Sequence, residues 1–185
     1  MTRERDDRLT QIDPESLSRE ELVALVGELQ TALAGQRGAA SRPAKPAASA
    51  RQVPGADFTL VFDGGSINNP GRGYGSYEVV DQDGQSLLDE QLQFGNNITN
   101  NQAEFMALIA GLKALLTLTG DRAATTSIAI RGDSQLVIRG LTGEWRVKHP
   151  GLLPLHRQAL DLLGQFGSVD IAWHPRRESV RVLGH

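Results

Sequence analysis

The sequence contains no cysteine among its 185 residues. This absence excludes a disulfide framework and any metal site built on thiolates. No apolar run approaches the roughly 20 residues that a membrane span needs. The charged segment 1–8 also lacks the apolar core of a signal peptide. We therefore expect a soluble, cytoplasmic protein without a membrane partner.

An excess of positive charge is also lacking, because the formal net charge at pH 7 is −3. A protein that coats nucleic acid broadly is expected to be basic, so this class is disfavoured. An enzyme that acts on nucleic acid is not excluded. A few well-placed cations and bound metal ions can offset a small negative charge.

The first third of the chain predicts a tail and a linker before a single globular domain. Residues 1–34 form the tail, in which Ser18 and Glu21 have the spacing of a capping box. An amphipathic helix should follow, with an apolar stripe at Leu22, Leu25, Val26, Leu29 and Leu33. Packing on its own domain and self-association or partner contact are both open roles for this helix. Residues 35–56 are rich in Ala, Pro and Gly and predict a linker, which leaves 57–185 for the domain.

The domain alternates between strand and helix patterns. Apolar alternation, helical spacing and turn residues predict strands at 58–63, 73–80, 86–94, 126–132 and 168–174, and helices at 100–118, 134–141 and 151–166. The order βββαβααβ predicts an α/β fold with a five-stranded mixed sheet flanked by helices. Strands 58–63 and 126–132 should run parallel and end at one edge, where open α/β sheets place their sites.

Three carboxylates occupy prominent places in this arrangement. Asp63 ends the first strand, Asp133 follows the fourth, and Glu104 is predicted in the first turn of helix 100–118, where the helix dipole favours a negative charge. Each alone is more often a turn residue or a dipole partner. Together, without Cys or His, they suit hard cations such as Mg²⁺ or Mn²⁺. Two such ions can hold the attacking and leaving oxygens of a phosphoryl displacement.

The residues around the carboxylates suit a nucleic acid. Gly64 and Gly65 allow a backbone to approach closely. The amides of Asn69, Asn100 and Asn101 can both donate and accept hydrogen bonds. Such groups can recognise 2′-hydroxyls and base edges across a minor groove, which distinguishes RNA from DNA.

These motifs carry a family resemblance. The segments Phe62-Asp63-Gly64-Gly65-Ser66 with Asn68-Asn69-Pro70-Gly71, then Thr99-Asn100-Asn101-Gln102-Ala103-Glu104, then Gly132-Asp133-Ser134 resemble type 1 ribonuclease H. The similarity is greatest to the compact bacterial and archaeal branch without a basic protrusion. It implies the ribonuclease H fold and Mg²⁺-dependent endonucleolytic cleavage of the RNA strand of an RNA–DNA hybrid, with 5′-phosphate and 3′-hydroxyl products.

The resemblance also implies roles for individual residues. Asp63, Glu104 and Asp133 would bind metal and act in catalysis. Thr99 would lie near a phosphate of the DNA strand. The expected nucleic-acid-binding residues are Gly64, Gly65, Asn69, Thr99, Asn100, Asn101 and Ser134.

The sequence departs from the family after the last strand. The branch has Pro-Arg, then an Asn, then an aspartate that is the fourth catalytic carboxylate. Aligned on Pro175-Arg176, Ser179 replaces the Asn and Leu183 replaces the aspartate, and the helix that normally follows has no counterpart. Three substitutes are open: the imidazole of His185, its terminal carboxylate, or Glu178. We include His185 among the predicted catalytic residues.

Other charged residues near this end complete the prediction. Five cations are expected to contact phosphates: Arg146, Lys148, Arg176, Arg177 and Arg181. His174 is expected to assist proton transfer or product release. The missing aspartate leaves open a second function, a catalytically weak or inactive nucleic-acid-binding protein of the same fold. A third class, another metal nuclease such as a transposase or a 3′ exonuclease, fits the Asn-rich motifs less well.

Overall fold

The computed structural model describes residues 54–183, which all fall in the second of two units, Ala47–His185. The predicted helix in residues 1–34 and the linker up to residue 53 lie outside the described residues, and so does His185. Their predicted roles therefore stay predictions.

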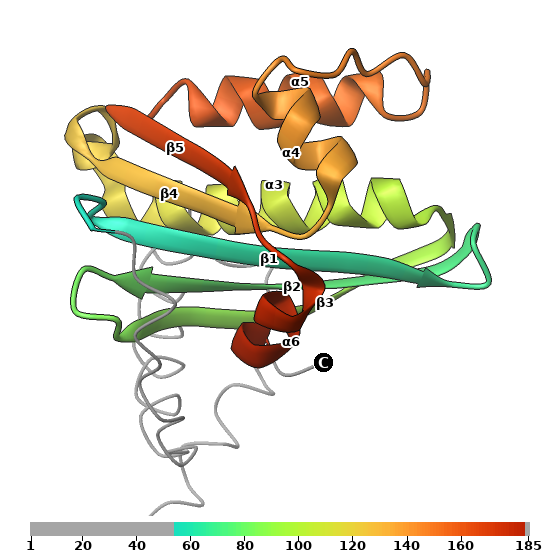
Figure 1. Cartoon of the computed structure of the whole chain (residues 1–185), viewed down its shortest axis with the longest axis horizontal. Coiled ribbons are helices and arrows are strands. Elements are labelled where there is room, and N and C mark those ends of the chain that lie inside the picture. The colour runs from blue at the N-terminus through green and yellow to red at the C-terminus, as the bar shows by residue number, and fades with distance from the viewer. Residues whose placement is uncertain (1–53, 184–185) are drawn as a thin grey trace, which may run out of the picture. The chain divides into compact units, whose positions relative to one another are not determined.

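The domain is a five-stranded mixed sheet with helices (Figure 1). Its elements are β1 (Phe58–Ile67), β2 (Gly71–Asp81), β3 (Ser86–Ile98), α3 (Asn100–Thr119), the 3₁₀ helix η2 (Gly120–Thr125), β4 (Ser127–Gly132), α4 (Gln135–Leu141), α5 (Leu153–Leu163), β5 (Ser168–Trp173) and α6 (Arg176–Leu183). The strand order is β3-β2-β1-β4-β5. β1, β2 and β3 are antiparallel neighbours, whereas β4 runs parallel to both β1 and β5. The predicted fold class is confirmed.

Two turns connect the antiparallel strands as the sequence predicts. Asn68 adopts a positive φ of 61° in the turn between β1 and β2, a conformation that asparagine tolerates better than most residues. In the turn between β2 and β3, the carboxylate of Asp81 accepts hydrogen bonds from the backbone N–H groups of Asp83 and Gln85, both at 2.9 Å. Gly84 supplies the positive φ of 76° there.

The main core lies between the sheet and α3. Leu60 and Phe62 of β1 are fully buried against Phe105, Leu108 and Leu112 of α3. The helix is so apolar that residues 100–125 could cross a membrane by length and composition, with a mean hydropathy of 1.4. More than half of its most apolar stretch is buried inside the domain, as in the central helix of a globular core.

The opposite face of the sheet carries a helix that the sequence analysis did not predict. Because successive side chains alternate between the faces of a strand, Val61 points away from the core formed by its neighbours Leu60 and Phe62. It packs instead in a second cluster with Val182 and Leu183 of α6. This helix, α6, begins at Arg176, shortly after β5, and covers this face (Figure 1), whereas the family helix without a counterpart would follow position 183, where the described residues end.

Candidate metal centre and nucleic-acid interface

Asp63 and Asp133 lie side by side because their strands are parallel neighbours. The last parallel pair joins Phe62 of β1 to Gly132 of β4, and each aspartate is the next residue along the chain after this pair. Asp133 follows the end of β4, as predicted. The prediction that Asp63 ends its strand is wrong: β1 continues to Ile67, and Asp63 lies opposite Ser76 of β2. It is the parallel pairing that ends at this point.

Glu104 reaches the two aspartates from α3. This helix starts with a capping box, in which the Thr99 side chain accepts from the backbone N–H of Gln102 while the Gln102 side chain accepts from the N–H of Thr99. The helix begins at Asn100, so Glu104 lies in its second turn and the first turn holds no acidic residue. The prediction of a first-turn position is therefore wrong. Packing against β1, more than the helix dipole, explains the place of Glu104.

The three carboxylates form a compact cluster. One oxygen from each of Asp63, Glu104 and Asp133 lies within 4.8 Å of the others. Asp63 is 1% exposed and Glu104 is 8% exposed, and Oε2 of Glu104 is buried without a hydrogen-bond partner in the described part of the chain. An all-oxygen donor set of this size, with a buried acceptor turned towards it, fits a hard divalent cation such as Mg²⁺ or Mn²⁺. The predicted metal ligands are brought together.

Mutual repulsion and burial dominate the electrostatics of this cluster. The pKa of Glu104 is raised from 4.5 to about 9, first by desolvation on burial and then by the carboxylates of Asp63 and Asp133. Without a metal ion, Glu104 is therefore mostly protonated at neutral pH. A bound cation would reverse this preference, because it stabilises the charged carboxylates.

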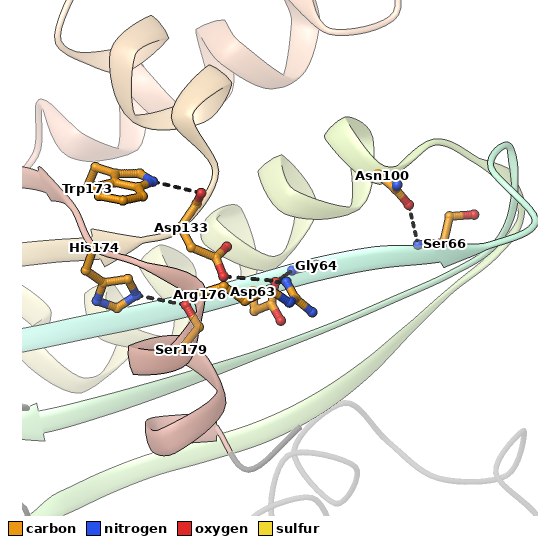
Figure 2. A network of polar contacts seen from close by, with 9 residues as sticks. All are labelled: Asp63, Gly64, Ser66, Asn100, Asp133, Trp173, His174, Arg176 and Ser179. Atoms are coloured by element: carbon orange, nitrogen blue, oxygen red, sulfur yellow. Dashed lines mark hydrogen bonds and ion pairs between the residues drawn. The ribbon is translucent and has the colours of Figure 1, made fainter.

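Arg176 supplies the positive charge that the described structure places against this cluster. Its Nη1 lies 3.4 Å from Oδ1 of Asp63 and 3.5 Å from Oδ2 of Asp133 (Figure 2). The two carboxylates raise the pKa of the guanidinium, Asp63 more than Asp133. Arg176 was predicted as a phosphate contact, and its ion pairs with the aspartates were missed. The order of the strands could have predicted these ion pairs, because β5 is parallel to β4 and the residues after β5 therefore reach the same edge as Asp133.

The end of β5 is tied to this edge by two further contacts (Figure 2). Trp173 donates from its indole N–H to the backbone carbonyl of Asp133 at 2.9 Å. The Nε2 atom of His174 lies 2.8 Å from Oγ of Ser179, which is fully buried in α6. Burial lowers the pKa of His174, and the carboxylates of Asp133 and Glu178 oppose that shift. The His174–Ser179 contact anchors the helix whose first residue is Arg176.

The predicted nucleic-acid residues gather beside the carboxylates along β1 and at the start of α3. Oδ1 of Asn100 accepts from the backbone N–H of Ser66 at 2.8 Å (Figure 2), and Oδ1 of Asn69 accepts from the N–H of Asn100 at 3.1 Å. These bonds hold the β1–β2 turn against the helix and leave the Asn69 and Asn100 side chains exposed. Asn101 is exposed on the same helix end.

The remaining predicted nucleic-acid residues differ in how accessible they are. Gly64 and Gly65 are buried, so their backbone is little exposed to a ligand. Thr99 is engaged as the helix cap. Ser134 is half-buried and precedes α4. No contact in the structure tests whether these residues bind nucleic acid, and that role stays a prediction.

Neither Leu183 nor Glu178 replaces the fourth carboxylate. Leu183, aligned with that aspartate, is 7% exposed and packs against Val61. The Glu178 carboxylate lies 3.4 Å from Arg181 and 3.7 Å from Arg177, and it is not among the carboxylates that cluster in the described residues. His185 lies outside the described residues.

Comparison with known proteins agrees with this geometry. Residues 61–182 match the family described as reverse transcriptase-like. The chain is 38% identical over 120 residues to a protein named ribonuclease HI from Halobacterium salinarum, which covers 65% of this chain and 57% of that protein. It is 43% identical over 118 residues to the bifunctional protein Rv2228c of Mycobacterium tuberculosis, covering 63% of this chain but 31% of that protein. The chain thus spans about a third of the mycobacterial relative.

Solved structures show the same fold. RNase H1 of Halobacterium salinarum superimposes with a TM-score of 0.60 at 37% identity, covering 67% of this chain and 89% of that one. LC11-RNase H1, solved in complex with an RNA/DNA hybrid, gives a TM-score of 0.62 at 27% identity, also covering 67% of this chain and 89% of that one. The N-terminal RNase H domain of Rv2228c gives 0.61 at 36% identity, covering 66% and 85%.

Proposed function

The chain belongs to the reverse transcriptase-like family and carries a ribonuclease H-like domain, and on this premise we propose that it is a metal-dependent endonuclease that hydrolyses the RNA strand of RNA–DNA hybrids. The observation that carries the proposal is the cluster of Asp63, Glu104 and Asp133. It is supported by a relative of the same fold whose structure contains an RNA/DNA hybrid. The cytoplasmic location predicted from the sequence is part of the proposal.

In this proposal Asp63, Glu104 and Asp133 hold two Mg²⁺ or Mn²⁺ ions. Such ions supply activation of a water and stabilisation of the leaving oxygen in an in-line displacement that leaves a 5′-phosphate. Asp63 is the central ligand, because β1 pairs with β4, after which Asp133 comes, and packs against α3, which bears Glu104. The buried walls formed by β1 and α3 keep the ligand oxygens in place before metal binds.

The exposed amides beside the cluster position the hybrid. Asn69 and Asn100 are fixed by the hydrogen bonds that join the β1–β2 turn to α3, so their free amide groups face the substrate with little loss of conformational freedom. Amides can recognise 2′-hydroxyls across the minor groove of a hybrid. This recognition selects the RNA strand, while the carboxylate cluster performs the chemistry.

The assay that tests this function uses four substrates. A labelled RNA–DNA hybrid is incubated with the protein and Mg²⁺ or Mn²⁺, beside duplex RNA, duplex DNA and single-stranded RNA. Internal cleavage of the hybrid's RNA strand, abolished by EDTA, is expected. Preferential cleavage of duplex DNA would contradict the proposed substrate.

A second function is favoured by one observation, the buried leucine at the position of the fourth carboxylate. A site that lacks this ligand could bind the hybrid with weak or no cleavage. Binding of a labelled hybrid without any metal-dependent product after long incubation would support this alternative over the nuclease.

A further inference from the structure

We infer that Arg176 is an internal cation that competes with divalent metal ions for the carboxylates of Asp63 and Asp133, and so sets the metal affinity of the site. The inference deepens the proposed function and rests on it, because it assumes that these carboxylates are metal ligands. It concerns how tightly the site binds its metal ions. The geometry that points to it is the bridging position of one guanidinium nitrogen between two aspartates (Figure 2).

The first step is that the guanidinium and a metal ion need the same two carboxylates. Nη1 of Arg176 approaches Oδ1 of Asp63 at 3.4 Å and Oδ2 of Asp133 at 3.5 Å. Those two residues belong to the cluster whose oxygens lie within 4.8 Å of one another. A cation bound between the carboxylates would repel a guanidinium at such a distance. Metal binding therefore requires Arg176 to withdraw.

The second step is that Arg176 is free to withdraw. Its side chain is 61% exposed, whereas the side chains of Asp63 and Asp133 are 1% and 6% exposed. The arginine reaches the cluster from the first residue of α6, and its backbone is held by the anchored helix. The carboxylates are fixed, and only the flexible arginine needs to change rotamer. The exposed position also screens the ion pairs, so the competition is moderate.

The third step is that the cluster needs a cation when metal is absent. The carboxylates of Asp63 and Asp133 belong to one cluster, and their side chains are only 1% and 6% exposed. Like charges so close destabilise each other. Arg176 partly relieves this repulsion, which stabilises the metal-free domain and lowers the net gain from binding a metal ion.

Arg177 provides a matched control. It is the next residue of α6, carries the same charge and is 82% exposed, but its Nε lies 3.7 Å from Glu178 instead of facing the carboxylate cluster. Arg176→Gln and Arg177→Gln therefore change the net charge equally, and only the first removes the contact with Asp63 and Asp133. Arg176→Lys keeps the charge with a different shape.

The experiment measures binding of Mn²⁺ alone to the full-length, metal-free proteins by isothermal titration calorimetry, without nucleic acid. For Arg176→Gln we expect Kd to fall about tenfold, equivalent to about 1.4 kcal/mol. Arg177→Gln and Arg176→Lys should stay within about threefold of wild type. Equal Kd values for the Gln variants at positions 176 and 177, or weaker binding by Arg176→Gln, would overturn the inference. Equal tightening by Arg176→Gln and Arg176→Lys would also overturn it, because the effect would then be steric.

A second measurement keeps the test decisive if Arg176→Gln does not fold. In the wild-type protein, the side-chain Nε–Hε NMR signal of Arg176, assigned with Arg176→Lys, should move on addition of Mg²⁺ while that of Arg177 stays. An unmoved Arg176 signal at saturating Mg²⁺ would refute competition. Hybrid cleavage is measured separately. If Arg176→Gln binds Mn²⁺ more tightly but neither wild type nor the variants cleave the hybrid, the proposed function fails and this inference stands. If wild type cleaves the hybrid but Arg176→Gln has the same Kd for Mn²⁺ as wild type, this inference fails and the proposed function stands.

Discussion

Gly64 of β1 and Ala103 of α3 approach each other so closely that no side chain fits between them. A Cβ atom on Gly64 would lie 2.4 Å from the carbonyl carbon of Ala103 and 2.5 Å from the backbone nitrogen of Glu104. These contacts are with backbone atoms, which cannot rotate aside. The missing side chain at position 64 thus lets the helix bring Glu104 next to Asp63, which precedes Gly64 in β1.

Replacing Gly64 by alanine should push α3 away from β1. We expect Gly64→Ala to lower the free energy of unfolding by about 2–4 kcal/mol, since overpacking against backbone leaves little room to relax, and to weaken Mn²⁺ binding. Gly164→Ala is the control, because its Cβ would meet atoms at an ordinary 3.5 Å and its φ is −64°. Urea denaturation and metal titration measure both effects. Equal stability of the two variants would contradict the close-contact argument.

Neutral, isosteric changes of the cluster should remove activity and preserve the fold. We expect Asp63→Asn, Glu104→Gln and Asp133→Asn each to lower hybrid cleavage by at least about 100-fold, because each removes a charge that holds metal. Asp170→Asn is the control, since that carboxylate is exposed and pairs with Arg131 of β4. Near wild-type cleavage by any of the three cluster variants would overturn the site assignment.

The raised pKa of Glu104 predicts how the metal-free protein responds to pH. Its pKa is about 9 in the folded protein against 4.5 as the ordinary value, because of burial and then of the adjacent Asp63 and Asp133. A group whose pKa rises on folding contributes stability that is complete below its unfolded pKa and is lost as pH rises through its folded pKa. The free energy of unfolding of the metal-free protein in EDTA should therefore decline as the pH rises from about 4.5 to about 9.

The matched variant for that prediction is Glu104→Gln, which has no proton to lose. Its free energy of unfolding, measured with urea at several pH values in EDTA, should decline less than that of wild type over the same range. Parallel curves for the two proteins would show that Glu104 does not titrate in this way. Added Mn²⁺ should bind wild type more tightly as pH rises, since Glu104 must release its proton to become a ligand.

Introducing an aspartate at position 183 should not add a fourth carboxylate to the metal site. Leu183 is buried with Val61 and Val182, so Leu183→Asp would place a charge in an apolar contact and leave a packing defect. We expect a loss of about 2–5 kcal/mol in the free energy of unfolding. Val180→Asp, at a position 41% exposed in the same helix, should cost far less. A gain in cleavage without loss of stability would show that α6 can repack around the aspartate.

His185 remains a predicted contributor to the site. If its imidazole binds metal, His185→Ala should lower cleavage more with Mn²⁺ than with Mg²⁺, because nitrogen ligands suit transition metals better. Wild-type activity with Mn²⁺ should also fall as pH drops through about 6.5, the usual pKa of histidine. Unchanged rates of the variant with both metals would exclude a catalytic role for the imidazole.

Local patterns in the sequence determined the strands, the central helix and the three carboxylates of the site. Alternating apolar residues predict β1 and β4, helical spacing predicts α3, and the turn residues set their order. Because parallel neighbours end at a common edge, Asp63 and Asp133 could be placed together without a structure. The expectation of a hard cation followed from the ligand chemistry, since carboxylates alone favour such ions.

Tertiary packing decided what local patterns could not express. Asp63 lies inside a longer strand because pairing with β2 continues beyond the parallel segment. Glu104 faces it from the second helical turn because Gly64 admits close contact. Arg176 reaches both aspartates because β5 ends beside β4 and α6 is anchored through His174 and Ser179. These relationships join residues up to 113 positions apart, and only the packing of the whole sheet brings them within reach.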